Sequence, residues 1–146
     1  MGMRFLLDTP TFLWLIGEPE RLPGTLVDLL ADENNPLLVS AASAMEVATK
    51  VRLGKLPAAA HLVAPAVWSA RVREIGADPL SLTTEHALLA GSLAWTHRDP
   101  FDRFLAAQAL AENATLATCD VAFAGVEGLS RIWFDRPIAT VDTAEL

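Results

Sequence analysis

Four short apolar runs stand out in the alternation of hydrophobic and polar residues along the chain. They cover residues 4–7, 37–40, 79–82 and 114–119. Runs of this length, bounded by turn residues, are typical of strands buried in a sheet. The pattern therefore predicts four buried strands.

Helical patterns fill the chain between and beside these runs. The segments are residues 12–17, 22–33, 44–56, 58–75, 85–95 and 101–113. We expect Thr9 or Thr11 to cap the first of them and Thr83 or Thr84 the fifth, because hydroxyl side chains satisfy free N–H groups at helix starts. Pro65 should break the fourth segment, and Gly54 should mark the end of the third.

Strands that alternate with amphipathic helices predict an α/β fold with a mostly parallel sheet. In such a sheet the carboxyl ends of the strands lie along one edge. Ligands of open α/β sheets bind beyond that edge. Functional residues should therefore be sought directly after the strands.

Composition narrows the class of protein. A chain of 146 residues that is 52% hydrophobic fits a single domain with one core. Its formal charge of −7 has the wrong sign for a surface that attracts nucleic acid everywhere, but leaves room for an acidic site that binds divalent cations. The single cysteine, Cys119, lies in an apolar run and fits a reducing compartment. With no apolar segment long enough to span a bilayer, we expect a soluble, cytoplasmic protein.

Four carboxylates occupy comparable places relative to the predicted strands. Asp8 directly follows the first strand, and Asp120 directly follows the fourth. Glu46 lies in the first turns of the helix after the second strand, and Asp102 begins the helix that leads into the fourth. Oxygen ligands on a rigid scaffold are what Mg²⁺ or Mn²⁺ requires. Such an ion would relieve the repulsion among the acids and support hydrolysis of a phosphodiester.

Each acid also has an explanation that involves no function. Asp8 and Asp120 fit turn or N-cap positions, and Glu46 stands three residues after Ser43, as in a capping box. Asp102 near a helix start is favoured by the helix dipole. Capping does not require four acids to converge on one edge, and this convergence favours the metal site.

The remaining polar residues give weaker signals. His61, His86 and His97 have no spacing typical of metal ligands; we expect His86 to be structural and His97 either to contact phosphate or, as we favour, to lie on the surface. Arg98 and Arg103, with Lys50 or Arg52 as further candidates, are the cations near the acids that can hold a phosphodiester backbone. Asp99, on the loop before Pro100, is an auxiliary candidate for the site.

Five segments, in this order and spacing, resemble PIN-domain ribonucleases, and specifically the VapC-type toxins of bacterial toxin–antitoxin pairs. The segments are FLLDTPTFLWL, LLVSAASAMEVATKVRLGKL, LSLTTEHALLAGSL, HRDPFDRFLAAQAL and LATCDVAF. The resemblance runs from Met3 to about Trp133. It assigns residues 1–133 to a PIN domain and 134–146 to a C-terminal tail.

The resemblance implies a three-layer α/β/α sandwich with a mostly parallel central sheet of four to five strands. It also implies an endoribonuclease dependent on Mg²⁺ or Mn²⁺ that leaves a 5′-phosphate and a 3′-hydroxyl, a cognate antitoxin as inhibitor, and a homodimer. The acids of the family correspond to Asp8, Glu46, Asp102 and Asp120. Pro10 departs from the pattern, because relatives often carry a polar residue there.

Two other hypotheses stay open at this point. The acidic edge can belong to a non-catalytic interaction module that binds basic residues of a partner protein. Aspartyl phosphotransfer with Asp8 as nucleophile is disfavoured, because phosphatases of that kind need a second aspartate where Pro10 stands.

Overall fold

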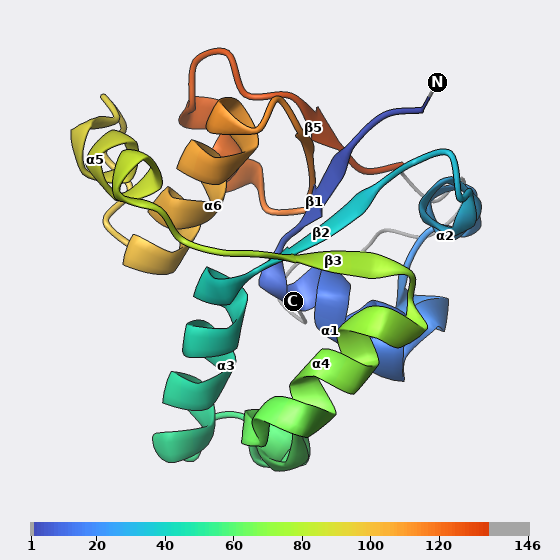
Figure 1. The fold of residues 1–146 in the computed structure, drawn as a ribbon. Helices are drawn as coiled ribbons and strands as arrows, with labels where there is room; N and C mark the ends of the chain where they lie inside the picture. The colour runs from blue at the N-terminus through green and yellow to red at the C-terminus, as the bar shows by residue number, and fades with distance from the viewer. Residues whose placement is uncertain (1, 135–146) are drawn as a thin grey trace.

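The centre of the molecule is a five-stranded sheet in which all neighbouring strands are parallel (Figure 1). This is a computed structural model, and it describes residues 2–134. The strand order is β3-β2-β1-β4-β5. The strands are β1 (Phe5–Leu7), β2 (Leu37–Ser40), β3 (Ala77–Leu80), β4 (Thr115–Ala117) and β5 (Arg131–Ile132). Apart from Phe134, the predicted tail 134–146 lies outside the described residues.

Helices cover both faces of this sheet (Figure 1). The α-helices are α1 (Thr9–Gly17), α2 (Gly24–Ala31), α3 (Ala41–Arg52), α4 (Pro65–Glu74), α5 (Thr84–Ser92) and α6 (Pro100–Ala111). Three short 3₁₀ segments connect them: η1 (Pro19–Arg21), η2 (Pro57–Val63) and η3 (Val121–Gly125). Pro65 begins α4 and separates it from η2, as its missing N–H predicts.

Two hydrophobic clusters bind the layers together. On one face, Phe5 and Leu7 of β1 pack with Phe12 of α1 and with residues of α2 and α4. On the other face, Leu6 packs with Leu105 of α6 and with Phe123 of η3. Neighbouring residues of β1 thus point to opposite faces, and all three are fully buried. The predicted three-layer sandwich is confirmed.

The third strand differs from its prediction by two residues. It spans Ala77–Leu80 rather than 79–82, because Gly76, with φ 71°, turns the chain directly out of α4 and into the sheet. Pro79 is tolerated in β3 because this strand lies at the edge of the sheet. The fourth strand is also shorter than expected, and it ends at Ala117.

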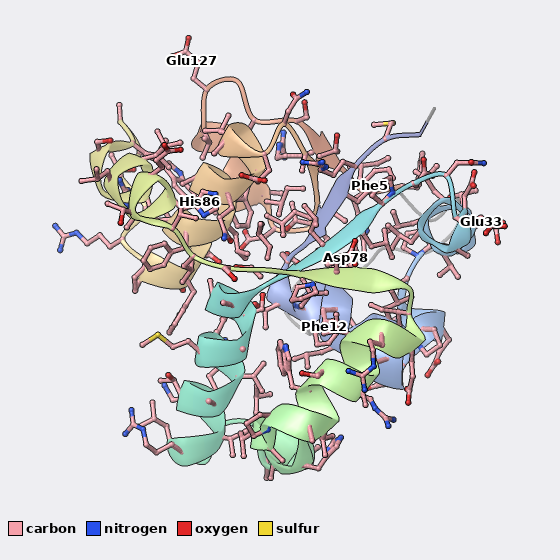
Figure 2. All side chains as sticks on the ribbon, viewed as in Figure 1. Phe5, Phe12, Glu33, Asp78, His86 and Glu127 are labelled. Carbon is pink, nitrogen blue, oxygen red and sulfur yellow. The ribbon has the colours of Figure 1, made fainter. Side chains whose placement is uncertain are left out.

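Polar side chains tie α5 and α6 to the end of β2, and we call Ser40, His86, Gln108 and Glu112 the polar network; the first three are buried and Glu112 is partly exposed. Ser40 Oγ donates to Gln108 Oε1. Gln108 Nε2 lies 3.2 Å from the Ser81 carbonyl oxygen and 3.3 Å from His86 Nδ1. Figure 2 shows His86 between α5 and α6, where its Nε2 lies 3.2 Å from Glu112 Oε2. His86 is structural, as predicted.

The strand order creates a crevice at the carboxyl edge. From β1 the chain adds β2 and β3 on one side, and β4 and β5 on the other. The connections after β1 and β4 therefore leave the sheet in opposite directions, which opens a ligand-binding position between them. Within residues 2–134, none of the helices has the length and apolar character needed to cross a membrane.

Candidate metal site

A pocket of about 400 Å³ lies at this carboxyl edge, beside the ends of β1 and β4. Its lining includes five carboxylates: Asp8, Glu46, Asp99, Asp102 and Asp120. Pro10 forms part of the wall, without a side chain able to hydrogen bond. A larger hollow of about 510 Å³ lies beside Arg4 and Asn113, before the start of β1 and β4, and has Glu112 as its one carboxylate among the lining residues. The acidic pocket is therefore the candidate site.

Asp8 joins the first strand to the first helix and serves both as helix cap and as pocket wall. Its Oδ1 accepts the Thr11 N–H at 2.9 Å, so Asp8, and neither threonine, is the N-cap of α1. Its Oδ2 accepts the Thr118 hydroxyl at 2.6 Å. Burial raises the pKa of Asp8 to about 6; these hydrogen bonds oppose the rise, and the charge of Asp120 adds to it. The capping interpretation was right and does not exclude a metal-binding one.

Glu46 is not part of the capping box that its spacing suggests. The N-cap of α3 is Ser40, whose Oγ accepts the Ala42 N–H, while Ser43 Oγ accepts the hydroxyl of Thr9. Glu46 consequently lies one turn further along α3 than a capping-box glutamate, is 6% exposed and faces the pocket. The structural explanation for Glu46 is wrong, because the helix begins three residues earlier than the motif requires.

Asp99 and Asp102 have different places at the start of α6: Asp99 caps the helix, and Asp102 lies in its first turn with its side chain at the pocket. Asp99 is the N-cap of α6, and its Oδ1 accepts the N–H groups of Phe101 and Asp102 at 2.9 and 3.3 Å. Asp102 lies in the first turn, and its Oδ2 is 2.7 Å from His97 Nε2. Burial raises the pKa of Asp102 to about 6. The hydrogen bond from His97 opposes this rise, and the charges of Asp99 and Glu46 add to it. Ligand atoms of His97, Asp99 and Asp102 all lie within 4.8 Å of one another.

His97 is the site residue that the sequence analysis missed. We expected a surface position or a contact with phosphate; its side chain is 31% exposed, and its imidazole lies against Asp102 and packs on Trp95, with ring centroids 4.7 Å apart. Its separation of five residues from Asp102, across the Pro100 bend, was a weak signal for this contact. The spacing alone does not show which way the loop folds.

Arg103 is engaged by the backbone rather than free for a substrate. Its guanidinium nitrogens donate to the carbonyl oxygens of Ala90, Leu93, Trp95 and His97 at 2.7–2.9 Å. These bonds hold the segment that carries His97, so the predicted substrate contact of Arg103 is replaced by a positioning one. Arg98 is exposed and does not line the pocket, whereas Lys50 does.

Three residues of the wall, Cys119, Asp120 and Val121, come from the segment after β4. Asp120 is exposed and accepts the Ala122 N–H at 2.9 Å, which makes it the N-cap of η3. Cys119 is half-buried, and burial, with the neighbouring Asp8 charge, raises the pKa of its thiol to about 11. Cys119 therefore stays protonated at neutral pH and is a poor nucleophile.

The donor set of the pocket fits a hard divalent cation. All five carboxylates offer oxygen, and they come from the chain just after β1 and β4, from the second turn of α3 and from the start of α6. Two of them, Asp8 and Asp102, have pKa values raised toward neutrality because burial disfavours their charge. A cation with oxygen preference would stabilise the ionised form of both.

Comparisons with known proteins agree with this fold. The family model described as the PIN domain matches residues 5–129. The structure is similar to VapBC2 from Rickettsia felis bound to a promoter DNA fragment, with TM-score 0.67, 21% identity, and coverage of 91% of this chain and 100% of that one. It is also similar to VapBC-1 from nontypeable Haemophilus influenzae, with TM-score 0.61, 19% identity and coverage of 89% and 97%. FitAcB from Neisseria gonorrhoeae gives TM-score 0.58, 21% identity and coverage of 88% and 96%. No curated protein matches the chain.

Proposed function

The chain belongs to the PIN domain family, and from this premise we propose that it is an endoribonuclease dependent on Mg²⁺ or Mn²⁺ and the toxin of a toxin–antitoxin pair. One observation carries the proposal: acids that are distant in sequence line a single pocket at the carboxyl edge of the sheet. The family membership and the sandwich fold predicted from the sequence are confirmed.

In this proposal Asp8, Glu46, Asp102 and Asp120 hold the ion, directly or through water, and Asp99 is auxiliary. A bound divalent ion supplies a more acidic water and a polarised phosphodiester. The protein supplies rigid carboxylates: Asp8 is fixed by Thr11 and Thr118, and Asp102 by His97. Fixed ligands need no reorganisation when the ion binds.

The substrate contacts must be local, because the formal charge of −7 repels RNA at long range. We propose two cations for the RNA backbone, Lys50 and Arg98. Lys50 lines the pocket, and Arg98 is exposed and directly precedes the lining residue Asp99 in the sequence. Arg103 is left out of this set because its N–H groups already bond to four carbonyl oxygens.

A cognate antitoxin is the protein partner that we propose. Support comes from the similar structures, which are of VapBC and FitAcB assemblies. A basic side chain of such a partner would find the five carboxylates of the pocket and form a charge-assisted contact. A homodimer in the cytoplasm is part of the same proposal.

The test compares RNA cleavage by purified wild type, Asp102→Asn and Asp78→Asn with Mn²⁺ and with EDTA. Asp102→Asn should lower the rate about 10³-fold or more, since an ion in such a site contributes several kcal/mol. Asp78 lies exposed on the edge strand β3 (Figure 2) and does not line the pocket, so Asp78→Asn removes one carboxylate and should leave cleavage unchanged. Circular dichroism verifies folding. Undiminished cleavage by folded Asp102→Asn would refute the proposal.

The alternative, a non-catalytic interaction module, shares the same acidic pocket. Calorimetry separates the two functions, because an interaction module has no need for the metal. If metal-stripped wild type binds no Mn²⁺ and cleaves no RNA, but still binds a basic partner peptide, the interaction module is the better description.

A further inference from the structure

We infer that Lys50 is an internal counter-cation of the acidic pocket, which competes with the divalent ion for Glu46 and serves RNA phosphate once the ion is bound. This inference rests on the proposed function and deepens it. It names a residue that sets metal affinity and couples it to substrate binding.

The contact between Lys50 and Glu46 is unusual in its position. The two residues lie one turn apart on α3, and Lys50 Nζ is 2.7 Å from Glu46 Oε2. Pairs at this spacing usually lie on the solvent side of a helix and contribute a few tenths of a kcal/mol. Here the Glu46 side chain is only 8% exposed, and both residues line the pocket. The ammonium thus lies at the proposed metal site rather than on an outer face.

The lining residues of the pocket carry far more negative than positive charge, so the single ammonium of Lys50 matters. The lining holds five carboxylates, and Lys50 is the one basic residue among the lining residues. Burial is the main cause of the raised pKa of Asp102, and the nearby charges of Asp99 and Glu46 raise it further. Lys50 offsets one negative charge of this group. A divalent ion at the same carboxylates must displace the ammonium or bind beside it, against repulsion between the two cations.

The second half of the inference concerns the substrate. An RNA phosphate that enters the pocket meets carboxylates on several sides, and Lys50 is the cation already inside. Its side chain is 44% exposed and flexible, so its Nζ can leave Glu46 for a phosphate oxygen without moving α3. Metal binding at Glu46 would free the ammonium for this purpose. Lys50 would then restrain metal binding in the empty site and favour substrate binding in the loaded one.

A purely structural ion pair predicts different behaviour. If Lys50 only stabilises α3, its removal should lower stability slightly and leave metal affinity unchanged or weaker. If it competes with the ion, its removal should make metal binding tighter. The two explanations differ in sign, which makes them separable.

The experiment titrates metal-stripped full-length protein with Mn²⁺ by calorimetry and measures RNA cleavage at saturating Mn²⁺. Lys50→Gln should bind Mn²⁺ about fivefold to tenfold more tightly, from the loss of one positive charge nearby, while its KM for RNA rises. Lys50→Arg keeps the charge and should stay near wild type in both measurements. Lys55→Gln is the matched control: it removes the same charge from an exposed position just after α3, outside the pocket lining, and should change neither.

A double-variant cycle adds the link to Glu46. In the Glu46→Gln background, where the ammonium has lost its partner, Lys50→Gln should change Mn²⁺ affinity much less. Unchanged or weaker Mn²⁺ binding by folded Lys50→Gln, with active wild type, would overturn this inference alone. Wild type that neither binds Mn²⁺ nor cleaves RNA would overturn the proposed function instead.

Discussion

Helix α6 carries two groups of polar side chains that differ in how they are satisfied. Toward the carboxyl edge, Asp102 joins the acidic pocket, where five carboxylates share about 400 Å³. Further along the helix, Gln108 joins the polar network with Ser40 and His86. Both groups lie in a largely apolar domain, and both depend on residues distant in sequence.

In the polar network, hydrogen-bond donors are paired with acceptors, whereas the acidic pocket gathers five carboxylates that are all acceptors. Gln108 is fully buried, accepts from Ser40 and donates toward Ser81 and His86. The carboxylates, in contrast, are acceptors only, so when ionised they cannot satisfy one another. A buried polar group that is paired internally stabilises a structure, whereas a surplus of one charge requires something from outside. On α6, Gln108 therefore belongs to a structural group and Asp102 to the proposed functional one.

The largest expected effect is on the network. Gln108→Leu keeps the approximate volume but leaves the Ser40 hydroxyl, the Ser81 carbonyl and His86 Nδ1 with fewer partners, which should lower the free energy of unfolding by about 3 kcal/mol. Urea denaturation measures this. Ser92→Ala removes hydrogen bonds on an exposed helix end and should change the free energy by less than about 0.5 kcal/mol. Equal stability of Gln108→Leu and wild type would contradict the stabilising role of the polar network.

The pocket should respond to substitution in the opposite direction. The folded-state pKa of Asp8 is about 6, above its ordinary value of 3.8, so the metal-free protein should gain stability as the pH falls from about 6.5 to 4.5. Below the ordinary value both states are protonated and the gain is complete. Asp8→Asn removes the buried charge and should raise the free energy of unfolding at pH 7 by about 2 kcal/mol.

Denaturation curves across pH, in EDTA and in Mn²⁺, measure this effect. The wild type should be stabilised by Mn²⁺ and Asp8→Asn should not. If the free energy of unfolding of the metal-free wild type instead increased as the pH rose from 4.5 to 6.5, the prediction would be contradicted, because the sign of the Asp8 contribution would then be reversed.

The smallest expected effect concerns His97, which shares one property with the polar network and one with the acidic pocket. It is a polar partner, like the network residues, but it bonds to a pocket carboxylate. His97→Ala should weaken Mn²⁺ binding about tenfold, because residues that orient metal ligands contribute on that scale. His97→Gln keeps a donor near the position of Nε2 and should retain most of the affinity. His61→Gln, at an exposed position of η2, is the control, and equal losses in all three variants would show that the contact is not specific.

Much of the site was predictable because strand ends and acids are local features. Asp8, Glu46, Asp102 and Asp120 were all placed at the carboxyl edge from their positions after strands or at helix starts, and all four line the pocket. Side-chain partners were less predictable. The capping serine of α3 is Ser40 rather than Ser43, because the helix starts directly at the end of β2.

Sequence alone therefore determined the alternation of strands and helices, the parallel sheet and the acids at its edge, since these depend on periodicity and on the residues that end each element. Only the tertiary structure decided which buried groups share a space. It turned Arg103 toward four backbone carbonyls and His97 toward Asp102, and it placed the helical pair of Glu46 and Lys50 in the pocket rather than on the solvent side of α3. The physical reason is that a side chain's partner depends on charges and unpaired atoms brought near by packing, and local sequence carries no record of these.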